Sequence, residues 1–270
     1  MQDLLDLLAS TNETVPLDVA ALQLATIEYP NLTLDPYLAL LDSHASELSE
    51  RVSDLTDGEE FIETMNRYMV EELGFGGNQD DYYKPGNSCL NDVLTERVGI
   101  PITLSVVYME IARRLDRPLY GIGLPGHFIV QYDDGDFSAY IDVFNSGQIL
   151  LESECFALSK QVTGQDPGAD HDLLRPVTKR YILVRMLNNL RAVYFRQKSP
   201  PKAAEVLNLL IAAEPDVADS YKQRAICRAQ MEMYRGARSD FELYLRLNPH
   251  AHDRVQVEAQ IERLRAWLRN

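Results

Sequence analysis

The chain has 270 residues, of which 46% are hydrophobic, and its 41 acidic and 26 basic side chains give a net charge of −15. This length admits one large domain or two modest ones, and the hydrophobic fraction is ordinary for a globular protein with a core. The acidic balance argues against nucleic-acid binding, because a negative surface repels the phosphate backbone.

Cysteines, termini and short motifs exclude further classes. Cys89, Cys155 and Cys227 are widely separated and odd in number, which argues against a disulfide framework and also against a zinc site, since a zinc site would need closer pairs. The first residues lack the basic region of a secretory signal, and no segment approaches the ~18 apolar residues that span a bilayer. No phosphate loop, dinucleotide fingerprint or metalloprotease motif occurs. We therefore expect a cytoplasmic protein with no membrane segment, metal or cofactor.

Residues 1–75 are predicted to form a helical region. The apolar pattern opens with four leucines, Leu4, Leu5, Leu7 and Leu8. The pair Asp35-Pro36 is typical of a helix start, with an N-cap followed by proline in the first turn. Another helix is expected to open near Asp57 and to end at Gly74, since glycine readily adopts the left-handed conformation found after helices.

Residues 76–177 are predicted to form the central domain. Its first segment, residues 76–87, reads GGNQDDYYKPGN. A long, polar and aromatic loop of this kind is typical of functional loops and also of disorder. A short helix capped by Ser88 is predicted to run to Arg97, and a longer, buried helix is predicted to begin at Pro101.

A β-rich part follows. Its predicted strands are rich in aromatic and β-branched residues and read LYGIGL (119–124), HFIVQY (127–132) and FSAYIDVF (137–144). The dipeptide Asp134-Gly135 between the last two strands is a strong hairpin signal. Residues 153–177 are expected to be irregular.

The predicted hairpin brings a histidine to a carboxylate. If Asp134 and Gly135 are the two loop residues, His127 lies opposite Asp142 on one face, with Cβ atoms ~5 Å apart. An aspartate that holds a histidine tautomer makes two thirds of a nucleophilic triad. On the hairpin alone, a surface ion pair or a structural histidine is the simpler interpretation. A metal site would need more ligands than these two.

Residues 178–270 are predicted to be a helical tail with an internal repeat. Pro215 and Pro249 are 34 residues apart, and apolar residues recur at the same offset. The spacing resembles the tetratricopeptide (TPR) repeat, a helix–turn–helix unit, and the alternative is a plain helical bundle. Two repeats are fewer than the roughly three needed for stability alone, so we expect the tail to pack on the preceding domain with Val255–Leu268 as a capping helix.

The second repeat departs from the TPR pattern. Arg224 and Arg228 stand where large apolar residues are usual. Arginine is frequent in this part of the chain, and we expect most of these side chains on the solvated faces of helices.

The chain resembles the bacterial SirB-type transglutaminase-like proteins in two runs, NSCLNDVLTERVGIPITLSVVYMEIARRLDRPLYGIGLPGHFIVQY and YIDVFNSGQILL. The segments GIPITLS and GLPGHF are specific, and the resemblance covers nearly the whole chain. It implies an α+β fold: a helical N-terminal region, a papain-like core with a central helix on an antiparallel sheet, and C-terminal TPR-like α-helical hairpins. It also assigns His127 and Asp142 to the histidine and aspartate positions of the family.

The third member of the triad is missing from its usual place. Transglutaminases and papain-like proteases carry a cysteine at the N-terminus of the central helix, where the helix dipole and the histidine stabilise the thiolate. Here that slot holds Pro101, Ile102 or Thr103. The hydroxyls of Thr103 and Ser105 lack the reactivity of a thiolate. Cys89 precedes the slot by about a dozen residues and reaches the site only if the short helix folds back over it.

Two functions are consistent with this sequence. The first is a protein-binding, non-catalytic (degenerate) transglutaminase-like protein, whose TPR-like surface binds another protein or peptide; the acidic charge favours a basic partner. The alternative is a cysteine hydrolase or acyl-transfer enzyme that uses Cys89, His127 and Asp142, with Thr103 as a further catalytic candidate. The distance between the Cys89 sulfur and the His127 ring decides between them.

Overall fold

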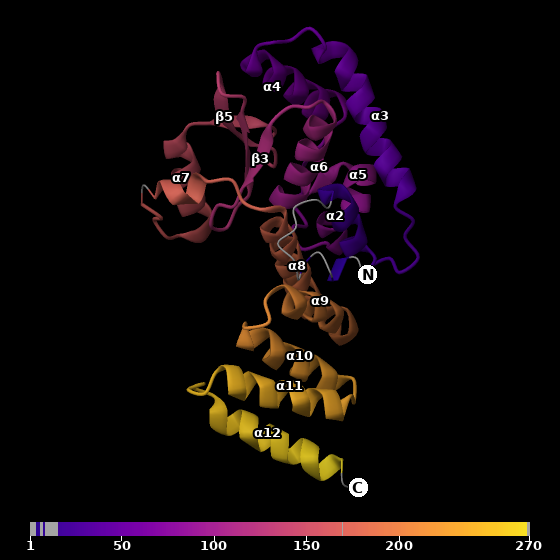
Figure 1. Cartoon of the computed structure of the whole chain (residues 1–270), viewed down its shortest axis with the longest axis vertical. Coiled ribbons are helices and arrows are strands. Elements are labelled where there is room, and N and C mark those ends of the chain that lie inside the picture. The colour runs from indigo at the N-terminus through magenta and orange to yellow at the C-terminus, as the bar shows by residue number, and fades with distance from the viewer. Residues whose placement is uncertain (1–3, 6–7, 9–15, 169, 269–270) are drawn as a thin grey trace. The chain divides into compact units, whose positions relative to one another are not determined.

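The computed structural model describes residues 4–5, 8, 16–168 and 170–268 (Figure 1). It divides into two compact units, one of Glu13–Met186 and one of Leu187–Asn270 together with Met1–Asn12. Of the four leucines that open the sequence, Leu7 lies outside the described residues, whereas the other three are helical. The division into regions 1–75, 76–177 and 178–270 stays a prediction.

The first unit begins with α-helices and a π-helical turn: α2 (Leu17–Ala25), α3 (Asp35–Val52), α4 (Gly58–Asn66) and η1 (Arg67–Glu72). Helix α3 starts at Asp35, with Pro36 in its first turn. Helix α4 starts where predicted, because the Asp57 carboxylate accepts hydrogen bonds from the first free amides. Gly74 follows η1 with φ of +78°, the left-handed conformation expected after a helix.

The central helix is preceded by short elements: β1 (Gly76–Gly77), η2 (Pro85–Ser88), α5 (Leu90–Glu96) and β2 (Val98–Gly99). Ser88 does not cap α5 as predicted, because it closes the 3₁₀ turn η2, and Cys89 takes the N-cap position. Strands β1 and β2 pair in parallel, which ties the loop 76–87 to the start of α6 (Pro101–Arg114). Helix α6 begins at Pro101 as predicted and is buried over most of its length.

The sheet is antiparallel with the strand order β3-β4-β5-β6. Its strands are β3 (Leu119–Ile122), β4 (Ile129–Asp133), β5 (Ser138–Asp142) and β6 (Gln148–Leu150). The predicted hairpin is present, but the predicted register is wrong by two residues, since Asp133 pairs with Ser138. The Asp134 carboxylate accepts hydrogen bonds from the amides of Asp136 and Phe137, so the loop has four residues instead of two. A shift of two residues keeps every side chain on its predicted face.

The sheet lies between two helices of the same unit (Figure 1). Helix α6 packs on β3 and β4, and α7 (Glu152–Thr163) covers the other face, where Cys155 belongs to the same buried cluster as Ile129 and Leu150. The expectation that residues 153–177 are irregular is therefore wrong for α7. That helix buries only Cys155 and Ser159 and so shows no apolar stripe in the sequence.

The second unit is helical and repetitive. Its helices are the C-terminal part of α8 (Lys179–Arg196), α9 (Pro200–Ala213), α10 (Ala218–Gln230), α11 (Tyr234–Leu247) and α12 (Arg254–Trp267). Helices α9 and α11 begin and end at equivalent positions of the 34-residue period. The helical repeat is thus confirmed, and α12 corresponds to the predicted capping helix. That the tail packs on the preceding domain stays a prediction.

The unusual arginines of the second repeat surround a buried carboxylate. Arg224 donates to both oxygens of Asp240, at 2.7 and 2.9 Å, and Arg228 donates to Oδ2 at 2.7 Å. Asp240 is only 2% exposed, so these two arginines do not lie on a solvated face as expected. The equivalent positions of the first repeat are all apolar and fully buried: Leu190, Tyr194 and Val206.

Candidate functional site: a buried histidine–aspartate pair

His127 is presented by a tight turn just before β4. Its backbone amide donates to the carbonyl of Leu124 at 3.2 Å, and Gly126 has φ of +73°. A β-carbon on Gly126 would lie 2.8 Å from side-chain atoms of Val162 and Thr163 in α7. Glycine is required here by both the left-handed backbone and the close approach of α7.

Two further side chains hold this turn. The hydroxyl of Ser159 donates to the carbonyl of Pro125 at 3.1 Å. Arg185, in the first turns of α8, donates through Nη2 to the carbonyls of Leu124 (2.8 Å) and His127 (2.5 Å). The position of the histidine is therefore set by α7 and α8 as well as by the sheet.

His127 and Asp142 form the pair that the sequence predicted. Nε2 of His127 lies 3.0 Å from both carboxylate oxygens of Asp142. Oδ1 also accepts from the amides of Phe144 and Asn145, and Oδ2 accepts from the Asn145 side chain at 2.7 Å. These donors keep the carboxylate in place as an acceptor, so we assign the histidine proton to Nε2, which leaves Nδ1 as the basic nitrogen.

An aromatic layer covers the pair. The ring of Phe144 meets the His127 ring edge-on, with centroids 5.9 Å apart, and Tyr82 in turn meets Phe144 at 6.3 Å. A β-carbon on Gly77 would lie 2.5 Å from the Phe144 ring, so the backbone of β1 rests directly on that ring. His127 and Asp142 are only 5% and 1% exposed. The loop 76–87 is thus an ordered cover over the pair.

Thr103 lies at the start of α6 but is hydrogen-bonded elsewhere. Its hydroxyl donates to the carbonyl of Asn87 at 2.7 Å and accepts from the amide of Ile100 at 3.1 Å. The side chain of Asn87 donates to the carbonyl of Tyr82 and so holds the aromatic loop. No hydrogen bond within the described residues joins Thr103 to His127. The threonine connects the central helix to the loop.

Cys89 lies at the start of the short helix α5. It is fully buried at the N-cap of α5, and its carbonyl accepts the amides of Asp92 and Val93. Burial and a hydrogen bond to Asp92 raise the pKa of Tyr29, and the Cys89 thiol is close enough to contribute to that shift.

The other two cysteines are core residues, as expected. Neither Cys155 nor Cys227 is in a disulfide, and both are buried. Burial, followed by the charges of Glu154 and Asp142, raises the pKa of Cys155 to about 12. Burial also raises the pKa of Cys227. Such thiols are almost wholly protonated at neutral pH and are poor nucleophiles.

Sequence reasoning missed three residues that shape this site: Asn145, Arg185 and Asn87. Asn145 had a usable signal, because an aspartate at a strand end followed by asparagine three residues later favours a turn with side-chain hydrogen bonds. Arg185 donates to backbone carbonyls of a distant segment, and the Asn87 carbonyl accepts from Thr103 of the following helix, so neither contact has a local signal in the sequence.

The described residues contain neither a metal-binding cluster nor a membrane-spanning helix. No three His, Cys, Asp or Glu side chains come together there as a metal ion would require. No described helix is long and apolar enough to cross a bilayer.

Comparison with known proteins agrees with this architecture. Residues 35–188 match the transglutaminase-like superfamily, and residues 190–262 match a tetratricopeptide-repeat family. A UPF0162 protein of Xylella fastidiosa is 36% identical over 253 residues, which cover 93% of this chain and 90% of the relative. The chain belongs to the UPF0162 family of transglutaminase-like proteins.

Other UPF0162 proteins and a eukaryotic protein share parts of the sequence. The UPF0162 protein of Pseudomonas aeruginosa is 28% identical over 263 residues, covering 97% of this chain and 95% of the relative. Human F-box only protein 21 is 31% identical over 180 residues, covering 62% of this chain but 28% of that protein. The expected combination of a transglutaminase-like domain with a TPR tail is thus confirmed for this UPF0162 chain.

Proposed function

We propose that this UPF0162 protein binds another protein through its TPR-like tail and that its transglutaminase-like domain is non-catalytic. The observation that carries the proposal is the hydrogen bonding of Thr103, which has the only hydroxyl or thiol among Pro101, Ile102 and Thr103 at the nucleophile slot. Its Oγ1 donates a hydrogen bond to the carbonyl of Asn87 and accepts one from the amide of Ile100. The slot therefore supplies no group that His127 can activate.

The histidine has a carboxylate but no nucleophile. Asp142 binds Nε2, and Nδ1 of His127 has no hydrogen-bond partner among the described residues. A general base must lie within about 3 Å of the proton that it removes, directly or through one water. Cys89 is fully buried at the N-cap of α5, and its thiol is one of the groups that raise the pKa of Tyr29. We infer that the pair joins the β4 turn to the loop after β5.

The tail supplies a surface for a partner. A groove of about 450 Å³ lies between α10 and α12, with Phe241 and Val257 among its apolar residues and Ile226 exposed to 40%. Lys222 and Asp253 form an ion pair at its edge. Because these two charges offset each other, the groove favours the apolar face of a peptide or helix over a charged group.

The acidic charge lies outside this tail. Residues 187–270 contain 14 basic and 10 acidic side chains, so the net negative charge of the chain belongs to residues 1–186. A basic partner, which the overall charge favours, would therefore bind the first unit. The groove of the tail would instead bind an apolar face of a peptide or helix.

Affinity capture with full-length variants tests the binding role. We expect the wild type and His127→Ala to capture the same protein, and Ile226→Arg to lose it because a charge enters the groove. Met233→Arg is the matched control, since Met233 is exposed but does not line the groove. The captured protein must then bind the purified wild type directly. Retention by Ile226→Arg, or loss with His127→Ala, would contradict the proposal.

A thiol-reactive probe tests the non-catalytic state. Cys89 should label no faster than an ordinary free cysteine, and His127→Ala should leave its rate unchanged. Cys155, with its pKa raised to about 12, is the slow internal reference. Rapid labelling of Cys89 that collapses in His127→Ala would favour the alternative, a cysteine hydrolase or acyl-transfer enzyme using Cys89, His127 and Asp142.

A further inference from the structure

The loop 76–87 presents two neighbouring tyrosines to solvent. Tyr82 is 37% exposed and Tyr83 is 44% exposed, and their rings meet edge-on with centroids 5.3 Å apart. Tyr82 also meets Phe144 at 6.3 Å, so the two rings rest on the aromatic layer that covers His127. Tyrosines are enriched at protein-binding surfaces, because the ring is a large apolar contact and the hydroxyl stays solvated.

The backbone that carries these rings is fixed by two asparagines. Nδ2 of Asn87 donates to the carbonyls of Asp81 and Tyr82, at 2.7 and 3.1 Å, and its Oδ1 accepts from the Asn78 side chain at 3.1 Å. Oδ1 of Asn78 in turn accepts from the amide of Asp81 at 3.0 Å. A segment that is ordered before it binds loses little conformational entropy on binding, which favours affinity.

Two carboxylates precede the tyrosines. Asp80 and Asp81 are exposed, and neither forms an ion pair within the described residues. Lys84 follows in the same loop, but its ammonium pairs with Glu96. Arg185, whose charge acts on the first tyrosine, donates to two backbone carbonyls. This surface therefore presents two acids and two aromatic rings to a partner.

Carboxylates beside aromatic rings fit a guanidinium group. The guanidinium plane stacks on a ring face while its N–H groups donate to a carboxylate. The chain itself contains this arrangement: Cζ of Arg51 lies 4.8 Å from the centroid of the Tyr68 ring, and Nη1 lies 2.6 Å from Oε1 of Glu72. An ammonium group has no plane to stack, and an anion would be repelled by both aspartates.

The charge of the first unit favours the same partner. Residues 1–186 contain 31 acidic and 12 basic side chains. This excess attracts a basic segment from a distance, and the loop then contacts its side chains at close range.

We propose that Asp80, Asp81, Tyr82 and Tyr83 form a docking surface for an arginine-bearing segment of a partner protein. One guanidinium stacks on a tyrosine ring and donates to an aspartate, and further arginines of the segment add electrostatic attraction. The inference rests on the proposed protein-binding role and deepens it, because it gives a basic partner a site on the first unit.

Fluorescence anisotropy of labelled peptides, titrated with the full-length protein at low ionic strength, tests the surface. The probes are Gly-Arg-Gly-Arg-Gly and the same peptide with lysine or with citrulline, which keeps the plane of arginine but lacks its charge. We expect the arginine peptide to bind about threefold more tightly than the lysine peptide and about tenfold more tightly than the citrulline peptide. Nα-acetyl-arginine methylamide should compete only weakly; competition as strong as that of the unlabelled peptide would indicate a site for free arginine and contradict the proposal.

Paired aspartate variants assign the binding to the loop. Asp80→Asn combined with Asp81→Asn should weaken binding of the arginine peptide about fivefold. Asp116→Asn combined with Asp136→Asn is the matched control, since it removes the same charge from exposed positions outside the loop, and its affinity should stay within about twofold of the wild type. Equal affinity of the two double variants would refute the inference.

Tyrosine variants test the stacking. Tyr83→Leu should abolish the preference for arginine over lysine, whereas Tyr120→Leu, at a tyrosine that is also 44% exposed, should keep it. Ile226→Arg, in the tail groove, should bind the peptide as the wild type does, so that a failure of this surface is distinguished from a failure of the proposed groove. If Tyr83→Leu fails to fold, the aspartate variants decide. No saturable binding of the arginine peptide, or equal affinity for the arginine and lysine peptides, would overturn the proposal.

Discussion

The hydroxyl of Thr103 lies 2.7 Å from the carbonyl oxygen of Asn87, and this hydrogen bond joins the first turn of α6 to the aromatic loop over His127. In a transglutaminase the same end of the helix carries the nucleophile. Here the side chain at that end maintains the structure around the histidine.

Replacing Thr103 should therefore affect stability strongly. Thr103→Val keeps the shape but leaves the Asn87 carbonyl and the Ile100 amide without their buried partner, so we expect the free energy of unfolding to fall by about 1–3 kcal/mol. Thr103→Ser keeps the hydroxyl and should lose less. Urea denaturation measures both. A valine variant as stable as the wild type would show that the bond contributes nothing.

The Asp142 carboxylate is predicted to be a structural acceptor of the fold. Asp142→Ala leaves the His127 ring and the amides of Phe144 and Asn145 without an acceptor, which should cost about 2–4 kcal/mol. Asp136→Ala, in the exposed hairpin loop, should stay within about 0.5 kcal/mol of the wild type. Equal stability of both variants would rule out this role.

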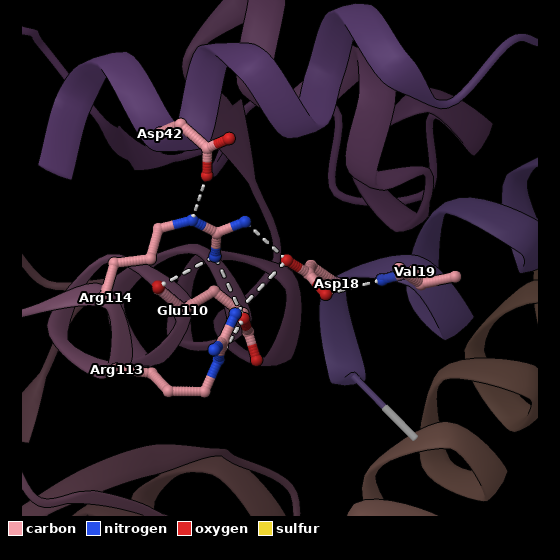
Figure 2. Close-up of polar contacts among 6 residues, drawn as sticks. All are labelled: Asp18, Val19, Asp42, Glu110, Arg113 and Arg114. Atoms are coloured by element: carbon pink, nitrogen blue, oxygen red, sulfur yellow. Dashed lines mark hydrogen bonds and ion pairs between the residues drawn. The ribbon is translucent and has the colours of Figure 1, made fainter. Parts of the chain in front are cut away.

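Glu110 should make stability depend on pH in a defined direction. Burial, followed by the charge of Asp18, raises the pKa of Glu110, although Arg113 and Arg114 oppose the shift (Figure 2). The folded pKa then exceeds the unfolded one, so the stabilisation is fully present below the unfolded pKa and is lost as the pH rises through the folded pKa. Glu110→Gln removes this dependence.

The comparison of Glu110→Gln with the wild type gives the measurement. We expect the destabilisation caused by the variant to be largest at acid pH and to shrink as the pH rises through the raised pKa of Glu110. Guanidinium chloride unfolding at a series of pH values, with both proteins in the same buffers, follows this difference. A destabilisation that grows with pH would contradict the assigned direction.

Arg224, Arg228 and Asp240 form the charged trio of the tail. Replacing Asp240 alone should lower the stability of the protein, whereas replacing all three residues together should not. Asp240→Ala leaves Arg224 and Arg228 beside an empty site and should cost about 3–5 kcal/mol. Replacing all three by the first-repeat residues, as Arg224→Leu, Arg228→Tyr and Asp240→Val, should be close to neutral or stabilising. Thermal unfolding of both variants is the test. A triple variant less stable than Asp240→Ala would contradict the equivalence of the two repeats.

The sequence predicted much of the pattern in the first unit because the signals there are local. Asp57 and Pro101 mark helix starts, and Asp134-Gly135 marks the hairpin. The register was wrong because the Asp134 side chain enlarges the loop, a choice between two turns that the dipeptide alone does not settle. Helix α7 was missed because its burial depends on Cys155 and Ser159 rather than on an apolar stripe.

The His127–Asp142 pair could be predicted because its signal is local, whereas the surroundings of Thr103 and Cys89 could not. The sequence puts His127 and Asp142 on neighbouring predicted strands, and a register shift of two residues keeps both on one face, although His127 itself lies in the turn just before β4. The positions of Thr103 and Cys89 depend on how α5 and α6 pack, which is a long-range property. The sequence shows that Thr103 has a hydroxyl, whereas only the structure shows that Asn87 accepts its hydrogen bond.

The contrast between the two repeats also bears on mispairing. Repeats that are alike in sequence can exchange partners, so that a helix packs against the equivalent helix one unit away. In this tail such an exchange would bury Asp240 against Leu190 and Tyr194, while Arg224 and Arg228 would meet Val206. Each of these mispaired contacts would bury a charge without an ion-pair partner in an apolar interior, which is strongly unfavourable. The ion trio therefore gives the two helical hairpins distinct identities and disfavours domain-swapped or slipped arrangements of the tail.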